Sequence, residues 1–254
     1  MSIKTATLNQ VATLEIARPE KKNAITADMY SAMAQALRAA DADPAVRVVL
    51  ITGQPGIFTS GNDLEDFMQR PPQGPDAPVF QFMRALSTLS KPVVAAVTGA
   101  AIGIGTTLLL HCDLVYVSDE ARLALPFTSL GLVPEFGSSL LVPLLAGHAR
   151  AAEKLLLGEP FTAQDAVDLG IANAVLPAGE VAMHARRIAE RFNALPPSAV
   201  RETKKLMKRA GAAQVQEAID AEAAVFAQRL SSPEAREAFS AFFQKRKPDF
   251  TQFS

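Results

Sequence analysis

The sequence predicts an α/β fold in which short strands alternate with helices and several further helices follow at the C-terminal end. Three observations lead to this prediction. Short apolar or β-branched segments, each bounded by Gly, Pro, Asp or Asn, recur through the first half of the chain. Apolar residues at helical spacing lie between these segments. Strand patterns almost vanish after about residue 179, and the spacing then becomes helical.

The individual elements follow in order. The expected strands cover residues 11–17, 46–52, 93–97 and 114–117. Thr26 is a good N-cap for a helix that runs to about residue 42, with apolar residues on one face: Met29, Met33, Ala36, Leu37 and Ala40. The proline-rich residues 71–78 predict an irregular surface loop, close to the candidate site formed by residues 58–64, residues 99–105 and Glu135. A short helix begins at Thr162 and ends at Gly170.

The last part of the chain is expected to be helical. An apolar stripe begins at Val181 and ends before Pro196 and Pro197, and helical patterns continue over about 198–245. Its other apolar members are Ala185, Ile188 and Phe192. We therefore divide the chain into an α/β core, residues 1–195, and a C-terminal helical region, residues 196–254. The basic residues of 204–209, balanced by acidic residues of 217–222, are expected to face solvent.

The composition excludes several classes of protein. The 254 residues, 49% hydrophobic and 20% charged, are enough to bury a large core. With 25 basic and 26 acidic residues, nothing favours nucleic acid or an anionic membrane as a partner. The single cysteine, Cys112, excludes an intramolecular disulfide and a cysteine-based metal cluster. No apolar leader opens the sequence and no peroxisomal tripeptide closes it, so we expect a cytoplasmic protein.

One segment resembles a membrane span, because residues 93–110 carry no charge over 18 positions. Gly99, Gly103 and Gly105 interrupt this segment, which begins with a strand pattern and ends with a helical one. A strand, a glycine turn and a buried helix explain it better. We therefore expect no membrane partner.

The candidate site consists of two glycine-rich segments and one carboxylate. Residues 58–64 read FTSGNDL, residues 99–105 read GAAIGIG, and Glu135 lies among apolar and small residues. A short glycine-rich turn at a strand end or helix start directs N–H groups at a negative oxygen without any special side chain. The three histidines stand apart, and GxGxxG, P-loop and GxSxG motifs are absent. We therefore expect neither a metal site nor a resident cofactor.

Five segments, in order, carry a resemblance to a known family. They are residues 17–24 (ARPEKKNA), 57–64 (IFTSGNDL), 99–113 (from GAAIGIG to HCD), 161–171 (FTAQDAVDLGI) and 241–250 (AFFQKRKPDF). Through them the chain resembles the crotonase (enoyl-CoA hydratase/isomerase) superfamily over essentially its full length. The resemblance implies a spiral of ββα units with a C-terminal helical trimerisation region. It also implies an acyl-CoA thioester as the substrate, and a homotrimer or a dimer of trimers.

The resemblance also assigns roles to particular residues. The backbone N–H groups of Asn62 and Ile104 are expected to bind the thioester oxygen, with Glu135 as the base. The residues expected to contact CoA or the acyl group are Lys21, Lys22, Ala24, Ser60, Gly61, Asp63, Leu64, Gly103, Gly105, Phe127, Leu132 and Lys245. Two alternatives stay open: the lysines are simply solvated, and Asp63 caps a helix that begins near Leu64.

Departures from the hydratase pattern indicate the subtype. Alignment through Cys112 and Pro126 places Thr107 and Phe127 where hydratases carry two glutamates, and neither side chain activates water near neutral pH. The context of Glu135 instead resembles the peroxisomal-type Δ3,Δ2-enoyl-CoA isomerases, in which one carboxylate moves a proton from C2 to C4.

Apolar neighbours are expected to raise the pKa of Glu135. These neighbours are Phe127, Leu132, Val133 and Phe136. The alternatives are another crotonase-type reaction (dienoyl or ring-opening isomerisation, or weak hydration) and a non-catalytic acyl-CoA-binding protein. In the second case Glu135 is incidental to the function. A separate alternative for Glu135 itself is a solvated loop carboxylate.

Overall fold

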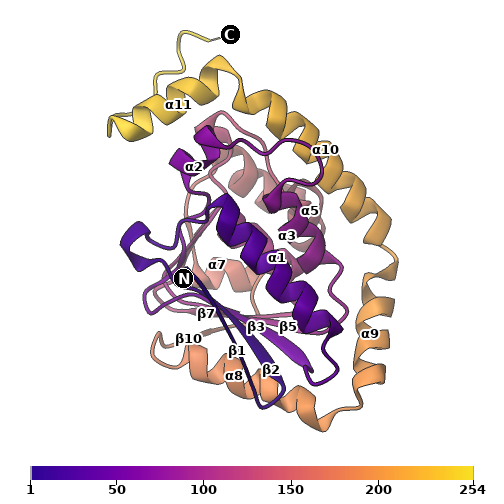
Figure 1. Ribbon diagram of the computed structural model, residues 1–254. Helices are drawn as coiled ribbons and strands as arrows, with labels where there is room; N and C mark the ends of the chain where they lie inside the picture. Colours follow the sequence, from indigo (N-terminus) through magenta and orange to yellow (C-terminus); the bar gives the residue numbers. More distant parts are fainter. Residues whose placement is uncertain (1, 254) are drawn as a thin grey trace.

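The computed structural model describes residues 2–253, which form two sheets with helices around them (Figure 1). The larger sheet has the order β1-β2-β3-β5-β7-β10 and is parallel apart from the β1–β2 hairpin. Its strands are β1 (Ile3–Leu8), β2 (Val11–Ile16), β3 (Val48–Thr52), β5 (Val93–Val97), β7 (Leu114–Ser118) and β10 (Ala174–Leu176). The smaller sheet has the order β4-β6-β8-β9, and its strands are β4 (Ile57–Thr59), β6 (Ala100–Ile102), β8 (Arg122–Ala124) and β9 (Phe161–Thr162).

The two sheets are built from a repeated unit. The pairs β3–β4, β5–β6 and β7–β8 each place their first strand in the larger sheet and their second in the smaller one, and helices follow each pair. This repetition is the expected ββα spiral. Its helices are α1 (Ala27–Ala42), α2 (Leu64–Gln69), α3 (Pro78–Ser87), α4 (Ile104–Thr107), α5 (Ser138–Ala146), α6 (His148–Ala152) and α7 (Ala163–Asp168).

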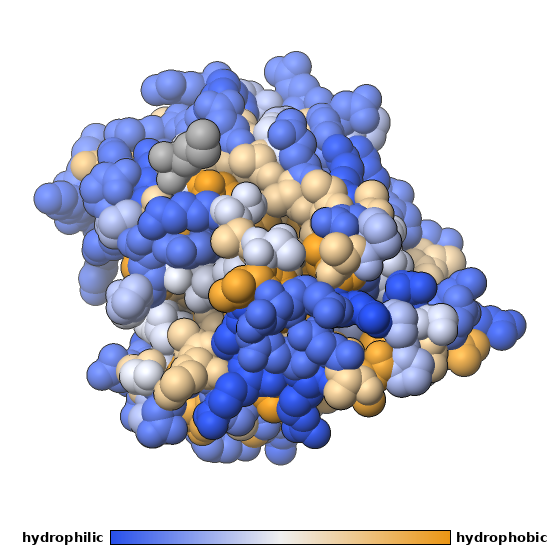
Figure 2. Space-filling model, turned by 60° about the horizontal axis from the view of Figure 1, so that its bottom comes forward, coloured by the Kyte–Doolittle hydropathy of each residue, from blue (hydrophilic) through white to orange (hydrophobic). Residues whose placement is uncertain are grey.

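Helices α8 (Val181–Arg191), α9 (Pro197–Arg209), α10 (Ala212–Leu230) and α11 (Pro233–Phe243) complete the chain. Helix α8 packs Val181, Ala185 and Ala189 on the larger sheet, on the face away from α1 (Figure 1). Helices α9, α10 and α11 then run along the outside of the core (Figure 1). Seen from the α8 side, the surface is mostly hydrophilic with separate apolar patches, as an amphipathic α8 requires (Figure 2).

The predicted strands and helices are confirmed to within two residues. Thr26 caps α1, because its hydroxyl accepts a hydrogen bond from the Met29 N–H. Thr162 and Asp165 form a capping box at α7, and Gly170 follows that helix with a φ of 75°. Residues 93–110 fold as β5, β6, α4 and a 3₁₀ turn. Within residues 2–253, no helix is both long and apolar enough to cross a membrane.

Three features differ from the expectations. Six strands were not expected: β1, in which Ile3 is the only buried residue, and the short strands β4, β6, β8, β9 and β10, each of two or three residues. Helix α3 begins at Pro78, at the end of the irregular proline-rich loop, because proline is well suited to the first turn of a helix. Lys204 does not face solvent: it is buried, and its Nζ donates to Asp113 Oδ2 and to the Lys91 carbonyl, at 2.7 Å each. Because α9 packs on the core, Lys204 is buried and its amine forms hydrogen bonds within the core. The division at residue 195 stays a prediction.

Candidate active site

The two glycine-rich segments meet because β4 and β6 are parallel neighbours, with Thr59 paired to Ala101. The loops that follow these strands therefore start side by side. A Cβ atom on Gly61, whose φ is +93°, would lie 2.9 Å from the Ile102 carbonyl oxygen. One on Gly105 would lie 2.5 Å from the Thr59 methyl carbon. Only glycine permits such close approach at both positions.

Two backbone N–H groups are left free at this junction. The Ile25 N–H donates to the Gly61 carbonyl, and the Ile25 carbonyl accepts from the Asp63 N–H, both at 2.9 Å. The Asn62 N–H therefore points away from Ile25. Ile104 is the first residue of α4, so its N–H has no acceptor within the helix. Among residues 2–253, neither N–H has a hydrogen-bond acceptor. The pair therefore has the donor chemistry of an oxyanion hole.

The segment of residues 18–24 holds the first of these loops in place. The buried Asn23 side chain donates to the carbonyls of Ile57 and Phe58, at 3.1 and 3.0 Å, and accepts from the Arg18 N–H at 2.7 Å. The Thr59 hydroxyl donates to the Asn23 carbonyl at 2.7 Å. Asn23 has a φ of 55°, which asparagine tolerates better than most residues. The predicted CoA loop and the first glycine-rich loop thus form one unit.

Asp63 is the N-cap of α2. Capping was the alternative to substrate contact that the sequence analysis left open for this residue. Its carboxylate accepts from the Asp66 N–H at 3.1 Å and from the Arg18 guanidinium at 2.7 Å. Burial alone would raise the pKa of Asp63, but these hydrogen bonds and the Arg18 charge hold it below the usual value. Leu64 is the first residue of α2 and packs partly buried on the core.

The predicted CoA-binding lysines lie on exposed turns. Lys21 is 3.7 Å from Glu65, and the Lys22 carbonyl accepts from the Ser60 N–H at 3.1 Å. The Ala24 carbonyl accepts from the Arg18 side chain. Lys245 follows α11 with a φ of 53° and is also exposed. That these lysines bind CoA phosphates stays a prediction.

Glu135 is only 7% exposed, and the turn that carries it is backbone-strained. Phe136 has a φ of +59°, which is rare for a bulky residue, and Gly137 follows with +73°. His111 donates from Nε2 to the Phe136 carbonyl at 2.7 Å and stacks on the phenyl ring at 3.8 Å. Burial lowers the pKa of His111 to about 3, so the ring is neutral. The Ser138 hydroxyl donates to the Glu135 carbonyl at 2.6 Å.

A small apolar cavity, of about 20 Å³, lies beside Glu135. Among residues 2–253, Glu135 is the one ionisable residue that lines it. The other lining residues are apolar: Phe67, Pro72, Val79, Phe80, Met83, Phe136, Ile219, Ala223 and Phe226. A second hollow shares four of these residues and continues to Gly74 and Pro75 of the proline-rich loop. Of the four expected neighbours of Glu135, only Phe136 lines this cavity. Phe127 and Leu132 are buried but do not line it, and the walls come from α2, α3, α10 and Pro72 of the proline-rich loop.

This environment changes the protonation of Glu135. Burial, followed by the nearby Glu222 charge, raises the pKa of Glu135 to about 8. Its Oε1 atom has no hydrogen-bond partner within residues 2–253. A carboxylate with such a pKa exchanges a proton readily near neutral pH. Thr107 and Phe127, at the positions of the hydratase glutamates, are both buried.

Two neighbours of the site were missed by the sequence reasoning. The Tyr30 hydroxyl of α1 donates to Asn62 Oδ1 at 2.5 Å, and burial together with the Glu135 charge raises the pKa of Tyr30 well above its usual value. Glu222 of α10 is buried rather than solvated. A signal for Glu222 exists, since it shares the apolar helix face of Ile219 and Phe226. For Tyr30 no local signal exists.

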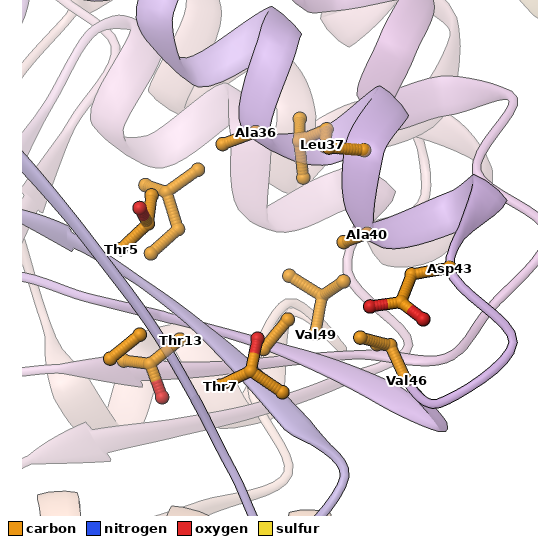
Figure 3. Close-up of a pocket in the computed structure, with 13 residues that line it drawn as sticks. Thr5, Thr7, Thr13, Ala36, Leu37, Ala40, Asp43, Val46 and Val49 are labelled. Atoms are coloured by element: carbon orange, nitrogen blue, oxygen red, sulfur yellow. The ribbon is translucent and has the colours of Figure 1, made fainter.

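A larger hollow, of about 280 Å³, lies between the β1–β2 hairpin and α1 (Figure 3). Small and apolar residues line it, together with threonines such as Thr5, Thr7 and Thr13. Its one carboxylate, Asp43, accepts from the Ala45 N–H at 2.8 Å. The hollow contains none of the residues assigned to the candidate site.

Comparisons with known proteins identify the family of this chain. The family model for enoyl-CoA hydratase/isomerase matches residues 6–253. The chain is 54% identical to Pseudomonas aeruginosa OdaA, with a TM-score of 0.93 over 95% of this chain and 98% of that one. It is 34% identical to the 1,2-epoxyphenylacetyl-CoA isomerase of Escherichia coli over 95% of each chain. It is 35% identical to human enoyl-CoA delta isomerase 2 over 76% of this chain, spanning half the length of that relative.

The chain therefore belongs to the enoyl-CoA hydratase/isomerase family. Its fold is the crotonase fold, and it is an enzyme of that superfamily, whose members act on acyl-CoA substrates. Hydratases of similar identity also occur among its relatives. The comparisons thus agree on the family and are divided between hydration and isomerisation.

Proposed function

We propose that this enzyme moves the double bond of an enoyl-CoA from position 3 to position 2. The observation that carries the proposal is Glu135, a buried carboxylate that has a free oxygen and lines an apolar cavity. Thr107 and Phe127 supply no second carboxylate to activate water. One proton-accepting group is enough for isomerisation, whereas hydration needs groups that activate water and deliver a proton.

The proposed reaction has two proton transfers. Glu135 takes a proton from C2, and the electron pair of that C–H bond moves into a dienolate whose charge rests on the thioester oxygen. The N–H groups of Asn62 and Ile104 stabilise that oxygen, each contributing about 3 kcal/mol by analogy with other oxyanion donors. The protonated Glu135 then returns the proton to C4, leaving a double bond between C2 and C3. No other reactant is consumed.

The substrate is proposed to lie with its acyl chain in the adjoining hollow, of about 230 Å³, with its reacting carbons at the small cavity beside Glu135 and its CoA phosphates near the exposed lysines. Lys21 and Lys22, with Lys245 from the C-terminal end, are the candidate phosphate partners. We further propose association through the C-terminal helical region as a trimer or pair of trimers. The acyl-CoA is the substrate, and the proposed steps use no cofactor.

A direct assay separates the candidate functions. Purified protein is incubated with trans-3-enoyl-CoA substrates of several chain lengths and, separately, with crotonyl-CoA. We expect conversion to the conjugated 2-enoyl thioester, followed by its ultraviolet absorbance, and little or no hydration. Hydration as fast as isomerisation would contradict the proposal, and binding without turnover would indicate an acyl-CoA-binding protein.

A second candidate is a ring-opening or dienoyl isomerisation over the same oxyanion hole. The similarity to 1,2-epoxyphenylacetyl-CoA isomerase over 95% of both chains favours it, as does a cavity rich in phenylalanine. The same assay with an aryl-acetyl epoxide thioester measures it. A clear preference for that substrate over every 3-enoyl-CoA would make this second candidate the function.

A further inference from the structure

Glu222 is a second buried carboxylate, and it contacts the turn that carries the proposed base. It lies on α10, in the region that the sequence assigned to subunit association. Its Oε2 atom accepts from the Gly137 N–H at 2.6 Å, and its Oε1 atom accepts from the Ser139 N–H at 2.8 Å. Glu222 is 7% exposed, so it is shielded from solvent as Glu135 is.

The two N–H groups lie at the start of α5: Gly137 is the N-cap, which has no capping side chain, and Ser139 is in the first turn. Glu222 therefore supplies from another helix the acceptor that a capping residue would normally provide. A helix N-terminus and two N–H donors favour the ionised carboxylate. Burial raises the pKa of Glu222 above its ordinary value, and these two hydrogen bonds offset only part of that rise. Glu135, by contrast, has an oxygen without a donor.

Glu222 and Glu135 thus differ in how well their surroundings stabilise the ionised carboxylate. Glu222 has two donors that stabilise its charge, and Glu135 has apolar walls from α2, α3 and α10. The other titratable groups around the turn are Tyr30 of α1, whose hydroxyl donates to Asn62, and the neutral His111, which donates to the Phe136 carbonyl. The hydrogen-bond donors favour the negative charge on Glu222 over Glu135.

We propose that Glu222 is a positioning residue for the base: it fixes the turn of residues 135–137, and its negative charge sets the pH at which Glu135 releases its proton. The positioning part follows from the strained backbone at Phe136, which persists only where surrounding contacts hold it. The charge part follows from repulsion between two buried carboxylates. The assignment rests on the proposed function of Glu135 as the base.

The test measures the titration of Glu135 directly. The carboxyl groups of ¹³C-labelled glutamates are followed by NMR against pH in the full-length protein, and Glu135→Gln identifies the Glu135 signal. We expect Glu222→Gln to lower the Glu135 midpoint by about one pH unit, since the charge is lost while one acceptor remains. The matched control is Glu217→Gln, an exposed glutamate on the same helix, which should leave the midpoint unchanged.

The pH dependence of turnover gives a second measurement. The rise of kcat/KM with pH should shift downward in Glu222→Gln by the same amount as the NMR midpoint. An unmoved NMR midpoint would overturn the proposal, even if turnover fell equally at every pH. Because the titration needs no substrate, it is decided separately from the reaction that the enzyme catalyses. An enzyme without isomerase activity but with the midpoint shift would overturn only the proposed function.

A second variant covers the case in which Glu222→Gln does not fold. Glu222→Asp keeps the charge but withdraws the carboxylate by one methylene, which loosens its contacts with Gly137 and Ser139. We expect this variant to lose turnover while the Glu135 midpoint stays close to that of the wild type. A midpoint that falls to the ordinary range of a glutamate in Glu222→Asp would contradict the electrostatic role.

Discussion

Replacing Glu135 with glutamine should make the protein more stable and nearly inactive. The pKa of Glu135 is about 8 in the folded protein, against an ordinary value of 4.5. Between these values the folded chain retains a proton that the unfolded chain releases, so the free energy of unfolding falls as pH rises. Each pH unit corresponds to about 1.4 kcal/mol, which gives a loss of about 3 kcal/mol by pH 7.

Glutamine does not ionise, so Glu135→Gln should escape this loss. We expect its unfolding free energy to exceed that of the wild type by up to about 3 kcal/mol at pH 7, with the two converging below pH 4.5, the ordinary glutamate pKa. Isomerisation should fall by about 10²–10⁴-fold, the usual effect of losing a general base, while CoA binding persists.

The measurement is urea unfolding at several pH values and matched protein concentration, together with the 3-enoyl-CoA assay. Glu120→Gln, at an exposed turn, serves as the control and should follow the wild type in both. The same pH dependence of unfolding in wild type and Glu135→Gln would refute the assignment of a buried, proton-retaining carboxylate. Wild-type activity in Glu135→Gln would refute its role as the base.

Three further predictions concern the residues around the proposed base and the association of subunits. Asn62→Ala keeps the backbone donor but leaves the Tyr30 hydroxyl unpaired, so it should cost about 1–3 kcal/mol of stability and reduce turnover far less than Glu135→Gln. Combining it with Tyr30→Phe should recover part of that loss, and strictly additive losses would speak against the contact. Gly61→Ala should destabilise the protein and abolish turnover, whereas Gly179→Ala, in open space, should be neutral; a folded, active Gly61→Ala would exclude the close approach. Light scattering should show a trimer or hexamer at micromolar concentration, and a stable monomer would contradict the proposed association.

The sequence alone determined those parts of the site that depend on a few consecutive residues. A positive φ, a close backbone approach and a free N–H at a helix start are local properties, so FTSGNDL and GAAIGIG indicated both donor loops. The same holds for Thr26 as the cap of α1 and for the β-branched segments of the larger sheet. Glu135 was found because its flanking residues resemble one subgroup of a family.

The tertiary structure decided the environment of Glu135, the proposed base. The apolar walls of the cavity beside Glu135 come largely from α2, α3 and α10. Of the four neighbours expected from the sequence, only Phe136 lines this cavity. Glu222 and Tyr30 reach the site from helices that are distant in sequence, and Lys204 is buried by the packing of α9. Desolvation and the pairing of charges depend on neighbours in space, which a local pattern does not encode. The local sequence therefore predicts the backbone N–H donors of the two glycine-rich loops, whereas the pKa of Glu135 follows from the way the helices pack around it.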